Sequence, residues 1–557
     1  MKIALVTTPP DVFSGIGDYT RHLLPYLRRH AEVDLFVEPG RDQDCGGEVF
    51  TSAAKLDDGA YDRVLYQLGN ESNHAFMAKR VRALGGVVMQ HDWVLFDMAI
   101  AAYPALARGG FKGAALALRE GGPEQLRTYL QNWIERRRDK RQPPHISDAG
   151  RLPGTLLAGW HGREPNGRWV ADAAWWRVPA SGVRRVAVLL ASVPGRLIRM
   201  LESGTELGRF ECRVDPRWTH LVCEVRNTDH PLLVLETDGV RVTQEQRRAG
   251  DIRRLATFVE KLEWEDDHGW HQVDLSTAPT QPIQSVSLSR DRFALPFNGS
   301  VVRGADAFLV HSEYVKSRIL GLRGQDTPIG ILRFGTERRW RDEPRPALRR
   351  ELGLPPAWAD GFLLVSFGGV QPHKRIDKVL EGLAIARRER PDIHLALVGN
   401  VVADAFDARE YARAVGVDQH VRFTGFVAED DAWRWLHAAD VSINLRGPTS
   451  GGTSAGIFQA YSLGRPVIAS DAAEQRELPD ACTLKVPLGH GEAEGVARVL
   501  IELRDDPHRL AGLCEAARDL VRRHCHWEHV AQSYIEHLER FPHPRSSKRA
   551  RLAAVAP

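Results

Sequence analysis

The sequence predicts an α/β protein with two doubly wound domains facing a cleft and a β-sandwich inserted in the first of them. Three observations predict this fold. The chain has 557 residues, which is too many for one hydrophobic core. Strand-like apolar segments alternate with helical patterns in residues 1–150 and again from residue 297, which is typical of parallel sheets covered on both faces. Between these regions, residues 155–275 hold short β-rich runs separated by turn residues, which is typical of a sandwich.

The first 150 residues supply most elements of one sheet. Their apolar runs have the length of buried strands, and the segments between them have the apolar spacing of amphipathic helices. Strands are predicted at residues 2–7, 33–37, 63–68 and 87–90, and helices at residues 18–29 and 72–84.

The inserted segment is predicted to be antiparallel because turn signals such as Asp238-Gly239 separate runs at residues 185–190, 221–226 and 231–236. It also holds seven of the fourteen tryptophans of the chain. Tryptophan fills the core of small sandwiches and also stacks on sugars, and the sequence leaves both interpretations open. These tryptophans are Trp160, Trp169, Trp175, Trp176, Trp218, Trp264 and Trp270.

The alternation of strands and helices returns after the insertion. A strand at residues 307–310 and a helix at residues 313–320 are followed by a second complete array that begins at residues 362–367. The predicted boundaries give a first α/β domain in two parts, an inserted sandwich, a second α/β domain and a flexible basic tail. They lie at residues 1–154 and 276–342, 155–275, 343–541 and 542–557, respectively.

Composition excludes several classes of protein. A formal charge of +3 over this length does not indicate a large nucleic-acid surface. Six scattered cysteines without metal-ligand spacing indicate reduced thiols and a cytoplasmic protein. The apolar start is too short for a signal peptide, and no run reaches the roughly 18 apolar residues of a membrane span. Basic runs at residues 135–141 and 545–551 are either peripheral membrane contacts or solvated surface.

Candidate functional residues follow several of the predicted strands. In doubly wound sheets, ligands bind beyond the carboxyl ends of the strands. Loops with glycine, asparagine or histidine occur there in both α/β domains, and together they indicate a single cleft. These loops hold residues 14–17, 69–70, 91–92, 368–374, 399–400 and 446–454.

The segment 439–471 has a loop of small residues between a strand and a helix. Ser454 is predicted to cap the helix, and Gly464 and Pro466 end it. The loop, residues 447–452, feeds the helix N-terminus, where free backbone N–H groups and the positive end of the dipole suit a diphosphate.

This segment and residues 366–377, SFGGVQPHKRID, resemble the donor-binding segments of the retaining, nucleotide-sugar-dependent glycosyltransferases of family 4, also called glycosyl transferases group 1. The resemblance implies the GT-B fold of two Rossmann-like domains, with the acceptor on the first domain and the nucleotide-sugar on the second. It also implies a closing helix near residues 528–538 that returns to the first domain.

The resemblance implies roles for residues of the second domain. Lys374 holds the position of the lysine that binds the donor pyrophosphate, and Arg375 is the nearest substitute for an arginine that the family often has at the position of Gly369. Helix-start residues are the alternative interpretation of both side chains. Further donor contacts implied in this domain are Gly369, Gly399, Gly452, Thr453, Ser454 and, at the ribose, Gln459.

In the first domain, the loop with Gly15 and Gly17 resembles the family loop beneath the donor phosphates, although a simple strand-to-helix turn is the alternative. His91 matches a family histidine that faces the transferred sugar. Its neighbour Asp92 either orients His91 or contacts substrate. His91 and Lys374 are therefore the candidate catalytic residues.

The chain also departs from the family, which places glutamates in the loop and on the helix. Here the loop has Gly451 and Gly452, and the helix has Gln459. A glutamate introduced at position 452 is expected to restore a contact to the donor sugar.

The predicted function is a retaining hexosyltransferase that moves a sugar from a nucleotide diphosphate-sugar to a cell-surface polysaccharide or glycolipid, with no cofactor, metal or nucleic acid. The alternative is a non-catalytic scaffold that binds sugar or nucleotide. The predicted location is the cytoplasm, with possible peripheral contact at the inner face of the plasma membrane.

Overall fold

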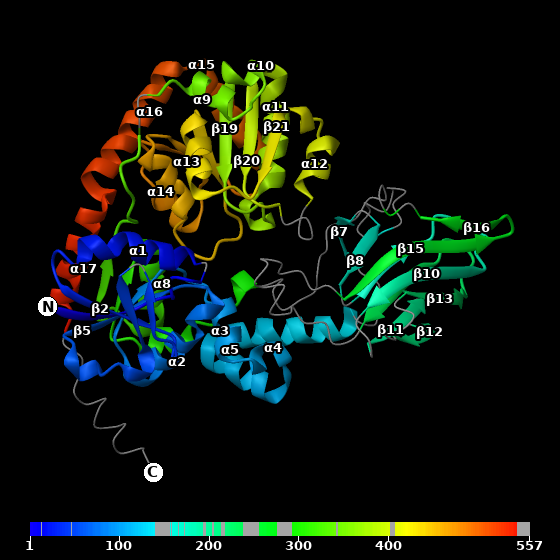
Figure 1. Ribbon diagram of the computed structural model, residues 1–557, viewed down its shortest axis with the longest axis horizontal. Coiled ribbons are helices and arrows are strands. Elements are labelled where there is room, and N and C mark those ends of the chain that lie inside the picture. The colour runs from blue at the N-terminus through cyan, green and yellow to red at the C-terminus, as the bar shows by residue number, and fades with distance from the viewer. Residues whose placement is uncertain are drawn as a thin grey trace, which may run out of the picture. The chain divides into compact units, whose positions relative to one another are not determined.

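The structure is a computed structural model. It describes residues 1–542 except residues 13, 46, 140–155, 157–158, 165, 172, 193–195, 203–204, 213–217, 238–255, 274, 276–291, 341–342 and 402–406. The chain divides into two compact units. The first contains Met1–Leu130, Asp291–Asn400 and Arg409–Pro557, and the second contains Gln131–Arg290 and Val401–Ala408 (Figure 1).

The first unit holds two parallel sheets, one in each α/β domain. The strands of the N-terminal sheet follow the order β18-β17-β6-β5-β1-β2-β4-β3, and its pairings are parallel except for the edge pair of β3 and β4. Its strands are β1 (Lys2–Val6), β2 (Glu32–Val37), β3 (Gln43–Cys45), β4 (Glu48–Ser52), β5 (Arg63–Leu68), β6 (Val87–Gln90), β17 (Ala307–Val310) and β18 (Ile329–Ile331). Because β17 and β18 follow residues 131–290 of the second unit in sequence, this part of the second unit is inserted into the N-terminal domain.

The C-terminal sheet follows the order β21-β20-β19-β22-β23-β24, with parallel pairings. The order of strands reverses between β19 and β22, so ligands are expected beyond the carboxyl ends of these two strands. The strands are β19 (Phe362–Phe367), β20 (Ile393–Val398), β21 (Val421–Gly425), β22 (Val441–Asn444), β23 (Val467–Ser470) and β24 (Thr483–Val486). Two doubly wound domains of this kind confirm the predicted GT-B fold.

Amphipathic helices cover both sheets. Those of the N-terminal domain are α1 (Gly15–Leu27), α2 (Ala75–Leu84), α3 (Phe96–Ala102), α4 (Ala105–Arg108), α5 (Gly110–Asp139), α7 (Gly299–Gly304) and α8 (Glu313–Arg323). Those of the C-terminal domain are α9 (Arg345–Glu351), α10 (Pro356–Ala359), α11 (Ile376–Glu389), α12 (Ala408–Ala414), α13 (Glu429–Ala438), α14 (Ala455–Ser462), α15 (Glu492–Asp505), α16 (Pro507–Leu520) and α17 (Trp527–Arg540). The sequence analysis did not anticipate α5, which is broken at Gly122 by a positive φ of 71°.

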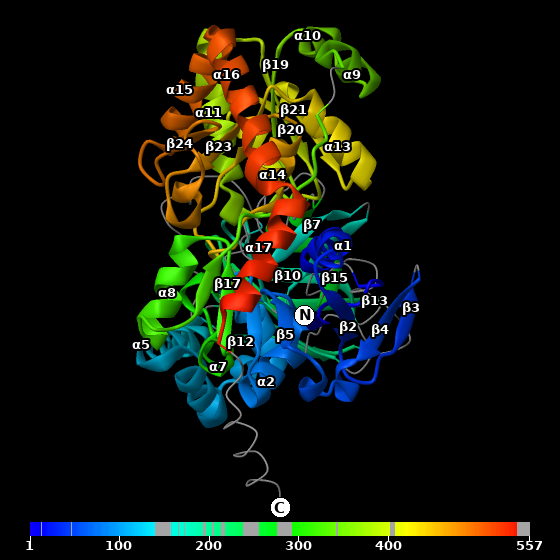
Figure 2. The same cartoon turned by 90° about the vertical axis from the view of Figure 1, so that its left-hand side faces the viewer.

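The closing helix α17 packs against the N-terminal sheet, as the sequence analysis expected (Figure 2). Its apolar face, with Trp527 and Tyr534, joins the same buried cluster as β1 and α1. The guanidinium of Arg63 in β5 donates to the carbonyl oxygens of Leu538 (2.8 Å) and Phe541 (2.8 Å). The chain therefore reaches from the C-terminal domain back to the core of the first, and residues 527–541 of the predicted second domain pack with the first.

The second unit is an antiparallel sandwich. One sheet has the order β13-β10-β15-β8-β7 with β16 beside β15, and the other has the order β12-β11-β14-β9. The inward faces of both sheets form one buried cluster that includes Trp160 and Trp176, whereas Trp218 and Trp270 are 39% and 44% exposed. The strands are β7 (Trp160–Glu164), β8 (Gly167–Val170), β9 (Ala173–Arg177), β10 (Arg185–Ser192), β11 (Leu197–Glu202), β12 (Thr205–Glu211), β13 (Trp218–Glu224), β14 (Leu232–Thr237), β15 (Thr257–Asp266) and β16 (Gly269–Gln272).

The described helices, basic runs and cysteines bear on membrane contact and on the state of the thiols. Across the described part of the chain, none of the helices combines the length and the apolar character needed to cross a bilayer. Of the basic runs, residues 135–139 form the end of α5, and residues 545–551 lie outside the described residues. All six cysteines are free thiols.

Candidate functional site

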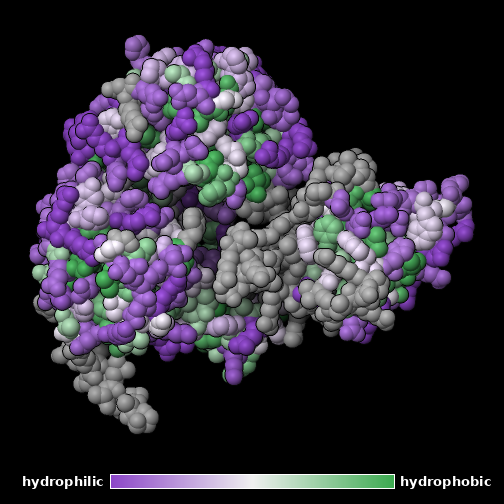
Figure 3. Space-filling view, viewed as in Figure 1, coloured by the Kyte–Doolittle hydropathy of each residue, from purple (hydrophilic) through white to green (hydrophobic). Residues whose placement is uncertain are grey.

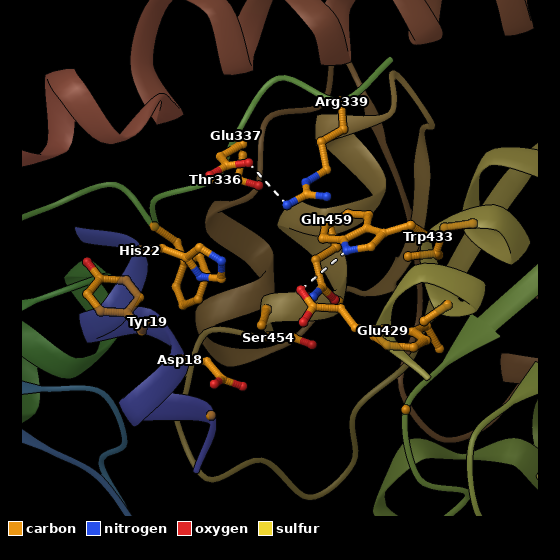
Figure 4. A pocket seen from close by; sticks show the side chains of 18 of the residues that line it. Asp18, Tyr19, His22, Thr336, Glu337, Arg339, Glu429, Trp433, Ser454 and Gln459 are labelled. Atoms are coloured by element: carbon orange, nitrogen blue, oxygen red, sulfur yellow. Dashed lines mark hydrogen bonds and ion pairs between the residues drawn. The ribbon is translucent and has the colours of Figure 1, made fainter. Parts of the chain in front are cut away.

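A pocket of about 460 Å³ lies at the carboxyl ends of the switch-point strands. It opens between the two α/β domains, where the space-filling view shows the surface hollowed (Figure 3). Asp18, Tyr19 and His22 of α1 form one side, and Glu429 and Trp433 of α13 face them from the other domain (Figure 4). The loops after β19 and β22 add two cationic side chains, Lys374 and Arg446, and the hydroxyl of Ser454 to the lining.

Lys374 is brought into the pocket by a short turn, Pro372–Lys374, that follows β19. Its Nζ donates to the carbonyl oxygen of Phe367 (3.0 Å). Burial, together with the nearby guanidinium of Arg446, lowers the pKa of Lys374 to about 7. The ammonium group therefore lies beside another cation in a site that disfavours its charge.

Arg446 completes this cationic pair and was not assigned by the sequence analysis. Its Nη2 donates to Ser454 Oγ (3.2 Å), and its Nη1 lies 3.3 Å from Nε2 of His373. Burial lowers the pKa of Arg446, and burial lowers the pKa of His373 to about 3, so the imidazole is neutral. Among the residues that the structure describes, neither Lys374 nor Arg446 forms an ion pair with a carboxylate. Two unpaired, desolvated cations indicate an anionic ligand.

The helix α14 begins beside Arg446. Ser454 precedes the helix, but its hydroxyl does not cap it, contrary to the sequence prediction, because Oγ accepts from Arg446 instead. One turn later, Gln459 lines the pocket. Its Oε1 is buried and has no hydrogen-bond partner within the described residues. An orphaned acceptor of this kind suits a ligand hydroxyl.

Arg375 does not act with Lys374, which corrects the sequence prediction. Its backbone is left-handed, with φ 54°, and its guanidinium turns away to the buried carboxylate of Glu492 (Nη2 to Oε2, 2.6 Å). The hydrogen bond to Glu492 raises the pKa of Arg375. Arg446 occupies the place beside Lys374 that the sequence analysis gave to Arg375.

His91 also lies elsewhere than predicted. It is buried beneath Tyr19, with ring centroids 4.8 Å apart, and does not line the pocket. Its Nε2 lies 2.8 Å from Gln67 Oε1 and its Nδ1 lies 3.2 Å from Nε2 of His311. Burial lowers the pKa of His91 well below its usual value. Both ring nitrogens lie within hydrogen-bond distance of other side chains, and the ring packs beneath Tyr19, so His91 supports Tyr19 and does not reach the pocket.

The predicted glycines differ in their position relative to the pocket. Gly15 lines the pocket, and the N–H of Gly17 donates to the capping Oγ of Ser14 (3.0 Å). Gly399 has φ 145°, and a side chain there would meet the backbone of Gly368 at 2.6 Å, so its role is close strand-end packing. Gly369, Gly452 and Thr453 do not line the pocket.

Aromatic and charged residues of the pocket were missed by the sequence analysis. They lie on α13, on the loop before it, on the segment between the domains and at the start of α17. Phe426 is 72% exposed at the rim. The group consists of Phe334, Glu337, Arg339, Phe426, Glu429, Trp433 and Trp527.

The suggested Gly452→Glu variant is expected to fail. The positive φ belongs to Gly451 (74°), not to Gly452, but a Cβ at position 452 would lie 2.0 Å from Oδ1 of Asp92. A second carboxylate would therefore be forced against Asp92, which is already buried. We expect the variant to bind nucleotide-sugars more weakly than the wild type in calorimetry. Tighter binding or faster donor turnover would restore the sequence-based expectation.

Ligand affinity should depend on pH through Lys374. The pKa of about 7 in the unliganded protein lies below the usual 10.5, so the lysine loses its charge as the pH rises through 7. Binding of a diphosphate ester should weaken from pH 7 to pH 9, while the unliganded protein becomes more stable over the same range because the unfavourable charge disappears. Calorimetry with UDP-glucose and GDP-mannose tests this.

Lys374→Met is the control, since it has no charge to lose and should abolish both pH trends. Retention of the trends in this variant would assign them to another group.

Residues 361–506 match the family model described as Glycosyl transferases group 1. The chain is 30% identical over 213 residues to a D-inositol 3-phosphate glycosyltransferase of Thermobispora bispora, covering 36% of this chain and 48% of that protein. It is 27% identical over 253 residues to a GDP-mannose-dependent alpha-(1-6)-phosphatidylinositol monomannoside mannosyltransferase of Mycobacterium tuberculosis, covering 44% and 65%.

The chain thus spans about half the length of the first of these relatives. Among solved structures, sucrose-phosphate synthase of Thermosynechococcus elongatus is 13% identical over 99% of both chains, with a TM-score of 0.48. The family match covers both switch-point strands and the loops with Lys374 and Arg446. This part of the C-terminal α/β domain is therefore similar to the glycosyl transferases group 1 family.

Proposed function

We propose that the protein is a retaining hexosyltransferase that takes its sugar from a nucleotide diphosphate-sugar. The observation that carries this proposal is the pair of unpaired cations, Lys374 and Arg446, at the switch point of the C-terminal sheet. A nucleoside diphosphate bears its charge where these side chains and the α14 N-terminus converge.

The remaining lining residues suit the rest of such a donor. The free Oε1 of Gln459 accepts a ribose hydroxyl, and the exposed ring of Phe426 offers a face on which a base stacks. The transferred sugar and the incoming acceptor are then expected to contact the N-terminal side of the pocket, which is formed by Asp18, Tyr19 and His22.

The reaction breaks the bond between the anomeric carbon and the diphosphate oxygen, and forms a bond from that carbon to an acceptor hydroxyl oxygen. The leaving diphosphate takes the proton of that hydroxyl on the same face of the sugar, which gives retention. Negative charge on the diphosphate grows as the bond breaks, and Lys374 and Arg446 stabilise it. The donor is a co-substrate, and no residue of the protein is covalently modified.

The acceptor is proposed to be a cell-surface polysaccharide or a lipid-linked saccharide. The relative from Mycobacterium tuberculosis is named for a phosphatidylinositol monomannoside acceptor. Six free thiols fit a cytoplasmic location, and peripheral membrane contact belongs to the same proposal.

A thermal-shift panel tests the donor. UDP, GDP, ADP and their common sugar conjugates are compared with the matching monophosphates, which lack the second phosphate. A ligand at about 100 times its dissociation constant should add about 2.7 kcal/mol to the free energy of unfolding. If no diphosphate stabilises the protein more than its monophosphate, the donor assignment is wrong.

The second candidate is a scaffold that binds nucleotide-sugar without turnover. One observation favours it. The loop glycines lie directly on the N-terminal domain, so the position where the family carries a loop glutamate has no room for a side chain. Release of nucleoside diphosphate from a bound donor, with acceptor or with water, separates the two, because a scaffold releases none.

A further inference from the structure

The loop between β22 and α14 is held by two carboxylates, one from each α/β domain. Within its own domain, Thr449 Oγ1 donates to Glu474 Oε1 (2.6 Å) and accepts from the N–H of Gly451 (3.0 Å). The hydroxyl therefore links a loop amide to a buried carboxylate. Ser450 repeats this arrangement one residue later.

Ser450 Oγ accepts from the N–H of Gly452 (3.3 Å) and donates to Oδ1 of Asp92 (2.9 Å). Asp92 belongs to the N-terminal domain and follows β6. Its other oxygen accepts from the N–H of Asn70 (3.1 Å), at the end of β5. Asp92 thus anchors the loop to the carboxyl ends of two strands of the opposite sheet.

The loop backbone lies directly on the residues around Asp92. The N–H of Val94 donates to the carbonyl oxygen of Ser450 (2.8 Å). A Cβ at Gly451 would lie 2.6 Å from Cβ of Trp93, and a Cβ at Gly452 would lie 2.0 Å from Oδ1 of Asp92. The two glycines are therefore required by close docking on the N-terminal domain, which accounts for the absent loop glutamate.

This loop joins two residues of the candidate site. It starts after Arg446 and ends at Ser454, and these two side chains are hydrogen-bonded to each other (3.2 Å) and line the pocket. Movement of the loop would change the position of Ser454 and the start of α14 relative to Arg446. Contact with the N-terminal domain consequently fixes the geometry of a site built mainly by the C-terminal domain.

We propose that Asp92 is a positioning residue which, from the N-terminal domain, orders the loop of residues 449–452 and thereby shapes the diphosphate site. Donor binding and contact between the domains are then linked, and each favours the other. The inference rests on the proposed function for its effect on the donor. The ordering of the loop is independent of that function.

The test compares three variants of the full chain. Asp92→Asn removes the charged acceptor with little change of shape, and Ser450→Ala removes the hydroxyl from the loop side. Asp97→Asn is the matched control. Asp97 also accepts from Asn70 (Nδ2 to Oδ2, 3.0 Å), and burial raises its pKa as it does that of Asp92. No contact joins Asp97 to the loop in the described part of the chain.

Hydrogen exchange of the peptide covering residues 446–458 is measured without ligand, and the affinity for UDP-glucose or GDP-mannose is measured by calorimetry. We expect roughly tenfold faster exchange in this peptide for Asp92→Asn and Ser450→Ala, as for a lost charge-assisted hydrogen bond. We expect donor affinity to fall by a similar factor, with unfolding temperatures close to that of Asp97→Asn.

Unchanged exchange in both loop variants overturns the inference, and so does an equal increase in Asp97→Asn, which would mean general loosening of the N-terminal domain. If Asp92→Asn does not fold, Ser450→Ala decides alone. If the wild type binds no nucleotide-sugar, the proposed function fails, and faster loop exchange still supports the anchoring role of Asp92.

Discussion

Replacing Lys374 by methionine is expected to remove most of the affinity for nucleotide diphosphates while making the unliganded protein more stable. The two effects have opposite signs for one reason. The ammonium group lies in a partly buried site next to Arg446, without a carboxylate partner in the described residues. Its charge therefore destabilises the protein when the site is empty, and phosphate oxygens offset this cost when they bind. A charge-assisted phosphate contact contributes about 1.5–3 kcal/mol, so affinity should fall roughly ten- to hundredfold.

Arg446→Met should also lower the nucleotide affinity, and the two losses of affinity should not add, because the cations interact and share one ligand. Arg375→Met is the matched control. Its side chain belongs to the same turn but pairs with Glu492, so its removal should lower stability and leave nucleotide affinity nearly unchanged. Thermal unfolding with and without UDP or GDP measures both quantities. Full affinity in Lys374→Met, or a less stable unliganded protein, would show that the cations are structural.

The sequence was sufficient for the fold because the fold depends on local patterns. Alternating strands and helices predicted both doubly wound sheets, and the predicted start of the second array at residues 362–367 is β19, Phe362–Phe367. Lys374 was found in the same way, since a strand, a tight turn and a helix place it at the carboxyl edge of the sheet. Gln459 and Ser454 line the pocket because helix spacing fixes them relative to the loop, and their contacts with a donor stay a prediction.

The errors concern residues whose partners are distant in sequence. Arg375 was assigned to phosphate because nothing near it reveals Glu492, which lies 117 positions away. His91 was assigned to the sugar, but Gln67 and His311 occupy its ring nitrogens. Arg446 was not assigned from the sequence, and only the three-dimensional arrangement places it beside Lys374. Charge pairing across the chain is a tertiary property that motif spacing does not contain.

The largest loss of stability is expected for Asp440→Asn. Asp440 lies just before β22, and its Oδ2 accepts from Nη2 of Arg349 (2.7 Å) and from the N–H of Leu363 in β19 (2.7 Å). The Arg349 side chain is only 3% exposed, and its remaining N–H groups donate to carbonyl oxygens, including those of Ala438 and Gly361. Neutralising the carboxylate leaves a buried guanidinium uncompensated, which costs about 3–5 kcal/mol.

The exposed pair of Arg350 and Asp360, 3.7 Å apart, provides the control, because Asp360→Asn should cost less than about 1 kcal/mol. Urea unfolding followed by circular dichroism measures both variants. The double variant Arg349→Met with Asp440→Asn should be more stable than the sum of the single changes predicts, since the methionine leaves no charge to compensate. Additive losses would show that Asp440 acts instead through the N–H of Leu363 and through its ion pair with Arg345 (Nη1 to Oδ1, 2.8 Å). Because Asp440 joins the starts of β19 and β22, whose ends carry Lys374 and Arg446, Asp440→Asn should also weaken nucleotide binding, whereas Asp360→Asn should not.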